Sequence, residues 1–180
     1  MTEIRPAVAA DASAIADIYN QGIAERSATF ETVPRTVGDI EQRLADLARY
    51  PLLVAIDDAG SVVGWAGLSS YRSRDCYAGI GEFSVYLDAS ARGRGIGRQL
   101  LQALIEVAQQ HGYWKLLSRI FVFNTASRAL CRSVGFREVG VYEKHGQLDG
   151  RWLDVVIVER LIPENLPISS TVASAATAFV

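Results

Sequence analysis

The chain has 180 residues, of which 49% are hydrophobic, and this suits a single domain with one substantial core. Its 18 basic and 20 acidic residues leave a formal charge of −2, so the overall balance indicates neither a nucleic-acid partner nor a strongly charged surface. Cys76 and Cys131 lack metal-ligand spacing, which argues against a disulfide framework or a zinc site. Without a leader pattern or a membrane-length apolar run, we expect a soluble cytoplasmic protein with no membrane partner.

Apolar periodicity and turn residues predict alternating strands and helices. In chain order they are a strand at 4–7, helices from Asp11 or Ser13 to Ile23 and from Thr36 to Leu47, strands at 52–56, 62–68 and 80–87, a helix that carries Leu100 to Ala108, a strand at 116–123, a helix at 125–134, and strands at 136–144 and 152–158. Each helix has one apolar stripe to bury, so we expect an α/β fold, a mixed sheet flanked by helices. Residues 1–163 form the predicted domain, and 164–180 a flexible tail.

A glycine-rich turn separates the strand at 80–87 from the longest predicted helix. It reads Arg92-Gly93-Arg94-Gly95-Ile96-Gly97-Arg98. Glycines let backbone N–H groups converge, and the helix N-terminus and the arginines add positive charge, so the turn suits a pyrophosphate. The P-loop and the dinucleotide fingerprint both fail on spacing. The alternative is a flexible connection with solvated arginines.

Glu82 interrupts an otherwise apolar strand. Alternation places Glu82, Ser84 and Tyr86 on one face and Phe83, Val85 and Leu87 on the other. A carboxylate in a core strand is costly unless it is hydrogen-bonded or functional, which makes Glu82 a candidate general base. The alternative is a carboxylate paired structurally with an arginine or exposed at a strand end.

The turn resembles the R/Q-x-x-G-x-G/A signature of GCN5-related acetyltransferases, matched by Arg92, Gly95 and Gly97. Residues 124–130 resemble that superfamily's N-x-x-A/S segment. The resemblance implies a mostly antiparallel sheet and acetyl-CoA as co-substrate, without a metal. The implied coenzyme-binding residues are Val85, Tyr86, Leu87, Arg92, Gly93, Arg94, Gly95, Ile96, Gly97, Asn124 and Ser127. Asn124 is equally suited to cap a helix, and the two roles are compatible.

The segment Glu82-Phe83-Ser84-Val85-Tyr86-Leu87 resembles the E-x-S/T-V-Y-V pattern of phosphinothricin-type acetyltransferases. By this resemblance Glu82 deprotonates the incoming ammonium, directly or through water. Many relatives carry Tyr or His where this chain has Cys131. Cys131 is therefore either the acid that protonates the departing coenzyme A thiolate or a small buried filler. We expect direct attack by the amine, with the Val85 N–H stabilising the oxyanion.

The acceptor is expected to contact loop residues. The candidates are Phe30, Arg72, Arg74, Tyr77 and His145. Arg72 and Arg74 are suited to grip a carboxylate and a second anionic group, or they are simply solvated. Across about residues 3–162 the chain resembles the phosphinothricin acetyltransferase family. Residues 71–74 and 141–146 resemble arsinothricin N-acetyltransferases most.

That resemblance implies acetylation of the α-amino group of a small glutamate-like amino acid, such as arsinothricin, phosphinothricin or methionine sulfoximine, in resistance to a toxic compound. It also implies a homodimer, with Tyr142 and Trp152 either in the interface or in the core. One competing reading is the same chemistry on a protein N-terminus or a polyamine. A second is a non-catalytic acetyl-CoA-binding module, which would not need Glu82, and a third is a nucleotide-binding regulator.

Overall fold

The computed structural model describes residues 2–166. Its strands are β1 (Glu3–Pro6), β2 (Leu52–Ile56), β3 (Val62–Ser70), β4 (Ile80–Leu87), β5 (Lys115–Phe121), β6 (Arg137–Leu148) and β7 (Arg151–Leu161), and its α-helices are α1 (Ala12–Ala24), α2 (Val37–Leu44), α3 (Ile96–Gln110) and α4 (Thr125–Ser133). The strands form one seven-stranded sheet in the order β1-β2-β3-β4-β5-β7-β6. All neighbouring strands are antiparallel except β4 and β5. The predicted mixed α/β fold and element order are confirmed.

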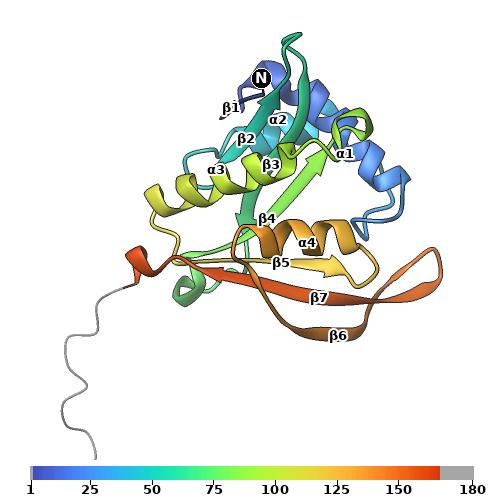
Figure 1. Cartoon of the computed structure of the whole chain (residues 1–180), viewed down its shortest axis with the longest axis vertical. Coiled ribbons are helices and arrows are strands. Elements are labelled where there is room, and N and C mark those ends of the chain that lie inside the picture. Colours follow the sequence, from blue (N-terminus) through green and yellow to red (C-terminus); the bar gives the residue numbers. More distant parts are fainter. Residues whose placement is uncertain (1, 167–180) are drawn as a thin grey trace, which may run out of the picture.

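The helices cover both faces of the sheet, α1 and α2 on one side and α3 and α4 on the other (Figure 1). Leu100, Leu101 and Leu104 of α3 are fully buried, and each such leucine contributes about 1.5–3 kcal/mol relative to an exposed one. The opposite core contains Trp65, which contacts the ring of Tyr86. The predicted alternation along β4 is therefore observed: Phe83 packs with α3, while Tyr86 packs with α1.

Some element boundaries differ from the sequence prediction. Helix α2 ends at Leu44, and Leu47 joins the α1–α2 core from a turn instead. Strand β6 continues to Leu148, because it pairs with β7 in a long ribbon at the sheet edge. Most β6 side chains are exposed, so this strand lacks the apolar alternation by which the sequence could have revealed its full length.

Strands β4 and β5 diverge, and this divergence positions the candidate site (Figure 1). They pair only between Ile80–Glu82 and Lys115–Leu117. Strand β3, by contrast, pairs with β4 from Gly81 to Leu87. Within residues 2–166, the second backbone edge of β4 beyond Glu82 has no strand partner, so its backbone is available to a ligand, apart from the Leu87 carbonyl oxygen, which accepts from Arg92.

The last described residues lie against the end of α3. Pro163–Asn165 form a 3₁₀ turn, and the Asn165 side chain donates to the carbonyl oxygens of Gln109 at 2.7 Å and Tyr113 at 2.8 Å. The expected flexible tail lies, from residue 167 onwards, outside the described residues. No helix in the described part of the chain is long and apolar enough to cross a membrane.

Candidate active site

Two adjoining cavities lie where β4 and β5 part. The first, of about 580 Å³, is here called the glycine cavity; its lining includes Val85, Tyr86, Leu87, Arg92, Gly93, Gly95, Gly97, Arg98, Asn124 and Ser127. The second, of about 490 Å³, is here called the Glu82 cavity; its lining includes Tyr19, Thr29, Phe30, Glu82, Ser84, Arg119, Phe121, Cys131 and His145. Val85, Tyr86, Asn124 and Ser127 line both, so the two cavities share a wall.

The glycines of the turn meet specific conformational requirements. Gly93 and Gly95 have φ values of +74° and +80°, in the left-handed region that side chains with a Cβ rarely adopt. A Cβ on Gly97 would lie 3.3 Å from Leu130, so glycine lets α3 pack closely there. The N–H groups of Gly95, Ile96 and Gly97 have no acceptor within residues 2–166, and they begin a helix of 15 residues. Such a terminus binds anions.

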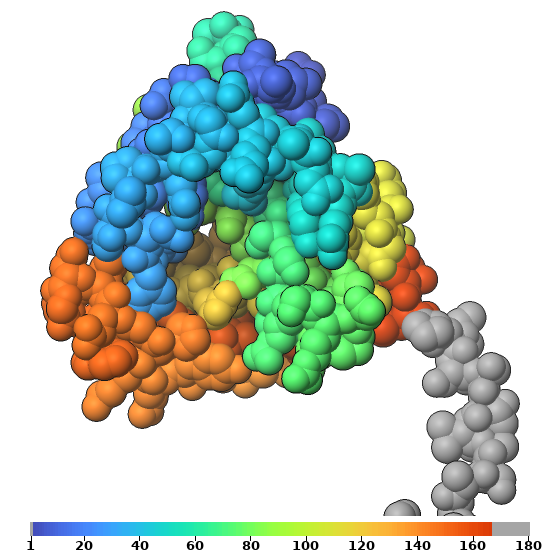
Figure 2. All heavy atoms as spheres, turned by 180° about the vertical axis from the view of Figure 1, so that it is seen from behind, coloured from blue at the N-terminus to red at the C-terminus, as the bar shows by residue number. Residues whose placement is uncertain are grey.

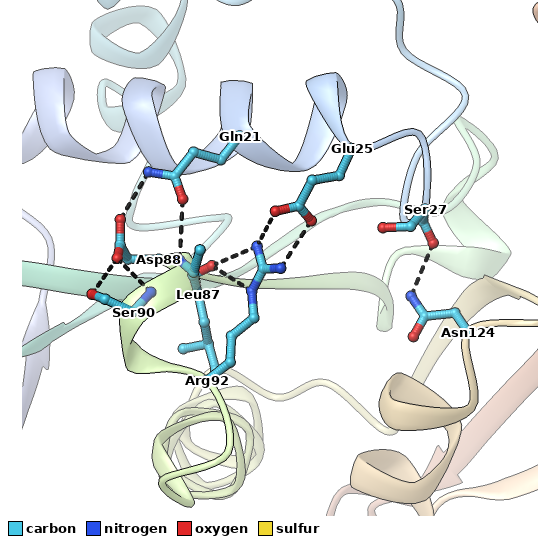
Figure 3. A network of polar contacts seen from close by, with 9 residues as sticks. Gln21, Glu25, Ser27, Leu87, Asp88, Ser90, Arg92 and Asn124 are labelled. Carbon is cyan, nitrogen blue, oxygen red and sulfur yellow. Dashed lines mark hydrogen bonds and ion pairs between the residues drawn. The ribbon is translucent and has the colours of Figure 1, made fainter.

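Arg92 bridges the turn to α1 (Figure 3). Its Nη1 and Nη2 atoms each lie 2.9 Å from the Glu25 carboxylate, while Nε and Nη2 donate to the Leu87 carbonyl oxygen. Its side chain is thus engaged within the protein. Arg98 lines the glycine cavity although it was absent from the predicted set.

Two other predicted coenzyme residues do not present their side chains to the glycine cavity. Arg94 is absent from the lining, and the Ile96 side chain is 2% exposed in the α3 core. Ile96 was predicted because of its place in the turn, yet its side chain belongs to the helical stripe. Any contact that Ile96 makes with a ligand must therefore come from its backbone.

A hydrogen-bond network fixes the beginning of the turn (Figure 3). The Gln21 amide donates to Asp88 at 2.8 Å and accepts from the Ala89 N–H at 3.1 Å. Asp88 in turn accepts from the N–H and hydroxyl of Ser90, and these bonds hold the pKa of its carboxyl below the usual value. Helix α1 therefore holds the entry to the turn in place.

Asn124 connects α4 with the segment that follows α1. Its Oδ1 accepts from the Ser127 N–H at 3.0 Å, which is the helix cap that the sequence suggested. Its Nδ2 donates to the Ser27 carbonyl oxygen at 3.0 Å (Figure 3). One side chain thus joins segments 97 residues apart at the shared wall of the cavities.

The Glu82 cavity opens on the surface as the hollow in Figure 2, bordered by residues of the α1–α2 connection (blue), β6 (orange) and the loop before β4 (green). The Glu82 carboxylate accepts from Arg119 Nη2 at 2.5 and 2.6 Å and from Nε at 3.1 Å. The Glu82 side chain is 18% exposed, against 43% for Arg119. The arginine pairing considered as an alternative therefore exists, but it lies inside a cavity.

Cys131 lines the Glu82 cavity from α4, yet it is only 2% exposed. Burial raises the pKa of its thiol to about 12, and the negative charge of Glu138 adds to the effect. The thiol is therefore neutral at physiological pH and a weak acid, which favours its interpretation as a buried filler.

Phe30 and His145, which were expected to contact the acceptor, line the Glu82 cavity. The Phe30 ring packs edge-on against Phe121, with 4.8 Å between ring centroids. A Cβ at Gly146 would lie 2.9 Å from Phe30, so a side chain there would force the ring or β6 to shift. Pairing of β6 with β7 is interrupted between Tyr142 and Gly146, and such irregularities re-aim side chains near active sites.

Arg72, Arg74 and Tyr77 do not line either large cavity. They lie around a smaller recess in the loop between β3 and β4, where the Arg72 guanidinium is 5.2 Å from the Tyr71 ring centroid. Figure 2 shows this loop on the rim of the hollow. The structure therefore places them beside the cavity and not in it.

Arg119 is a charged residue of the Glu82 cavity that was not predicted from the sequence. A signal existed, since Arg119 is a charged residue in the apolar run of β5. In the parallel pair of β4 and β5, Leu117 lies opposite Glu82. Arg119 is two residues further along β5, so its side chain lies on the same face of the sheet as Glu82. As for metals, residues 2–166 contain no group of three or more His, Cys, Asp or Glu side chains that could hold an ion.

Comparison with known proteins agrees with this geometry. Residues 4–157 match the family model described as an acetyltransferase (GNAT) domain. A methionine sulfoximine and methionine sulfone acetyltransferase of Pseudomonas aeruginosa is 38% identical over 87% of this chain and 92% of that protein. The chain belongs to the GNAT superfamily, in its phosphinothricin acetyltransferase family.

Solved structures support the assignment of this GNAT enzyme. A Sinorhizobium meliloti phosphinothricin acetyltransferase in complex with acetyl-CoA has a TM-score of 0.84 and 34% identity, covering 89% of this chain and 88% of that one. A ribosomal-protein-alanine N-acetyltransferase from Brucella melitensis has a TM-score of 0.85 and 37% identity, covering 89% and 99%. The family therefore has structural neighbours named for both small-molecule and protein acceptors.

Proposed function

We propose that this enzyme transfers the acetyl group of acetyl-CoA to the α-amino group of a small glutamate-like amino acid of the arsinothricin, phosphinothricin or methionine sulfoximine type, and so confers resistance to such compounds. The observation that carries the proposal is the Glu82 carboxylate, held in a cavity that shares a wall with a glycine-lined helix terminus. Names of relatives support the acceptor class.

The glycine cavity fits the phosphates of acetyl-CoA. The free N–H groups at the start of α3 would hold the pyrophosphate, and Arg98 would add a positive charge. The exposed backbone edge of β4, at Val85 to Leu87, would hold the pantetheine arm. The coenzyme supplies an activated acetyl thioester, which this arrangement would direct along β4 toward Glu82.

Glu82 acts in this proposal as the base that takes a proton from the acceptor ammonium, directly or through water. The free amine then attacks the thioester carbonyl directly, and the Val85 N–H stabilises the negative charge on the carbonyl oxygen. The C–S bond then breaks, coenzyme A leaves as the thiolate, and the new amide nitrogen gives its second proton to solvent. Phe30 and His145 bound the acceptor, while Arg72, Arg74 and Tyr77 contact its distal group from the rim. The high pKa makes Cys131 a poor donor to the coenzyme thiolate, so solvent is the proposed donor.

We further propose a cytoplasmic homodimer formed through β6 and β7. Large apolar side chains on these strands, Val139, Val141, Tyr142 and Trp152, are each about half exposed, with Trp152 at 57%. An exposed apolar group of this kind is typical of an interface with a second copy. Sedimentation velocity would give a dimer, and Trp152→Glu would shift it to monomer; a monomeric wild type would contradict this part.

The test is thiol release from acetyl-CoA against glutamate analogues, ordinary amino acids, polyamines and peptides. We expect the glutamate analogues to be turned over at least 100-fold faster than the other groups of acceptors. The Brucella neighbour favours a second candidate, acetylation of a protein N-terminus, and peptide turnover without small-molecule turnover would establish it. Binding of acetyl-CoA with no acceptor turned over would instead favour a binding module.

A further inference from the structure

The Glu82–Arg119 pair combines features that a purely structural ion pair does not need. Both side chains line a cavity of about 490 Å³. The acid is the less exposed partner, at 18%, and the arginine the more exposed, at 43%. An ion pair with one partner this exposed to solvent contributes little to stability, so stability alone gives no reason to place one here.

The pair also presents complementary charges to an amino acid. A free α-amino acid carries an ammonium and a carboxylate on one carbon atom. Glu82 presents an acceptor for the ammonium, and the planar guanidinium of Arg119 presents parallel donors that match a carboxylate. Ordinary aliphatic amines and internal lysines of proteins lack the carboxylate.

We propose that Glu82 and Arg119 form the receptor for the α-amino acid zwitterion, which inserts between them. Arg119 moves from Glu82 to the substrate carboxylate, while the substrate ammonium replaces the guanidinium at Glu82. The charge on Glu82 remains balanced throughout, so the carboxylate is never buried alone. This inference rests on the proposed function and names the feature of the substrate that the site selects.

Which residue moves follows from the structure. Arg119 has a long flexible side chain on β5, close to where β5 has parted from β4, and nearly half of that side chain is in solvent. Glu82 lies on the part of β4 that is paired on both sides, with Ser69 and with Leu117. Glu82 thus stays at the base of the cavity while Arg119 adapts. Arg72 and Arg74 on the rim then remain for the distal group of the substrate.

The test compares the best amino acid of the acceptor panel with its α-carboxamide, which keeps the amine and the shape but loses the charge. Wild type should prefer the acid by about 10- to 150-fold in kcat/KM, the range for hydrogen bonds to a charged group. Arg119→Gln should lower this ratio to within about threefold of unity, mainly because kcat/KM for the acid falls. Arg119→Lys should keep part of the preference, because the charge remains.

Arg132→Gln is the matched control, since Arg132 also pairs with a glutamate, Glu138 at 2.9 Å, but lies outside both cavities. It should keep the wild-type ratio. An equal loss with acid and amide in Arg119→Gln would overturn the inference, because Arg119 would then only position Glu82. An unchanged ratio would overturn it too, by assigning the carboxylate to another residue.

Calorimetric binding of the same amino acid, without acetyl-CoA turnover, separates this inference from the proposed function. The inference predicts binding that Arg119→Gln weakens by at least tenfold and Arg132→Gln does not change. Binding that depends on Arg119 without acetyl transfer would support the zwitterion site and contradict the proposed function. Acetyl transfer to amino acids that does not depend on Arg119 would support the proposed function and contradict the zwitterion site.

Discussion

The glycine cavity and the Glu82 cavity share a wall but are built differently. The first depends on backbone, in the left-handed Gly93 and Gly95 and the free N–H groups that open α3. The second depends on side chains from α4, the sheet and the loops. A backbone site recognises what all substrates of a family share, while a side-chain site can change with each acceptor. Under the proposed function, coenzyme binding belongs to the first cavity and acceptor choice to the second.

Glu82→Gln gives the largest expected effect, and it should change the chemistry in the Glu82 cavity without changing the glycine cavity. Loss of the base should lower kcat by about 10²- to 10⁴-fold, while the Kd for coenzyme A changes by less than about threefold. Stopped-flow thiol release and calorimetry measure the two. Glu138→Gln, which removes another arginine-paired carboxylate, should keep wild-type kcat. A Glu82→Gln enzyme with more than a tenth of wild-type kcat would contradict the assigned base.

Gly95→Ala tests the other cavity. The substitution places a Cβ at a φ of +80°, which costs about 1–2 kcal/mol, and disturbs the N–H groups that begin α3. We expect about tenfold weaker coenzyme A binding. Gly150→Ala is the control, because Gly150 has a φ of +76° and equally open surroundings but lies in the β6–β7 turn. Gly150→Ala should lose a similar amount of stability but keep its affinity for coenzyme A. An equal loss of affinity in both variants would contradict coenzyme binding in the glycine cavity.

Asn124→Asp acts on the shared wall. Aspartate can still cap α4 through the Ser127 N–H, but its carboxylate cannot donate to the Ser27 carbonyl oxygen. We expect KM to rise by about three- to tenfold for both substrates, with the melting temperature reduced by only a few degrees. Steady-state kinetics and thermal unfolding measure these effects. A rise confined to one substrate would show that Asn124 serves a single cavity.

Cys131→Ala should have the smallest kinetic effect. The pKa of about 12 means that thiolate is scarce at pH 8 and grows only as the pH approaches 12, so iodoacetamide should label exposed Cys76 and spare Cys131 in the folded protein. Cys131→Ala should change kcat/KM by less than about threefold and cost about 1 kcal/mol of stability. A 30-fold loss of kcat would instead establish Cys131 as the proton donor.

The sequence revealed the glycine cavity better than the Glu82 cavity for a physical reason. Turn conformation is local, so Gly93 and Gly95 could be recognised from a few consecutive residues. The engagement of Arg92 with Glu25 could not, because it needs the spatial approach of α1. Arg119 escaped notice because its relation to Glu82 depends on a parallel register between strands distant in the chain.

The alternating pattern of β4 predicted the face on which Glu82 lies, and the structure agrees. The loop arginines show the limit of such reasoning. Arg72 and Arg74 had the right chemistry for an anion, but sequence spacing gives no direction for a loop, and the structure places them around a separate, smaller recess.

Mass spectrometry of the reaction products tests the central claim most directly. With acetyl-CoA and L-methionine sulfone or phosphinothricin, the account predicts one N-acetylated amino acid for each coenzyme A released, and none with Glu82→Gln. Release of coenzyme A without an acetylated amino acid, or acetylated amino acid from Glu82→Gln at the wild-type rate, would contradict it.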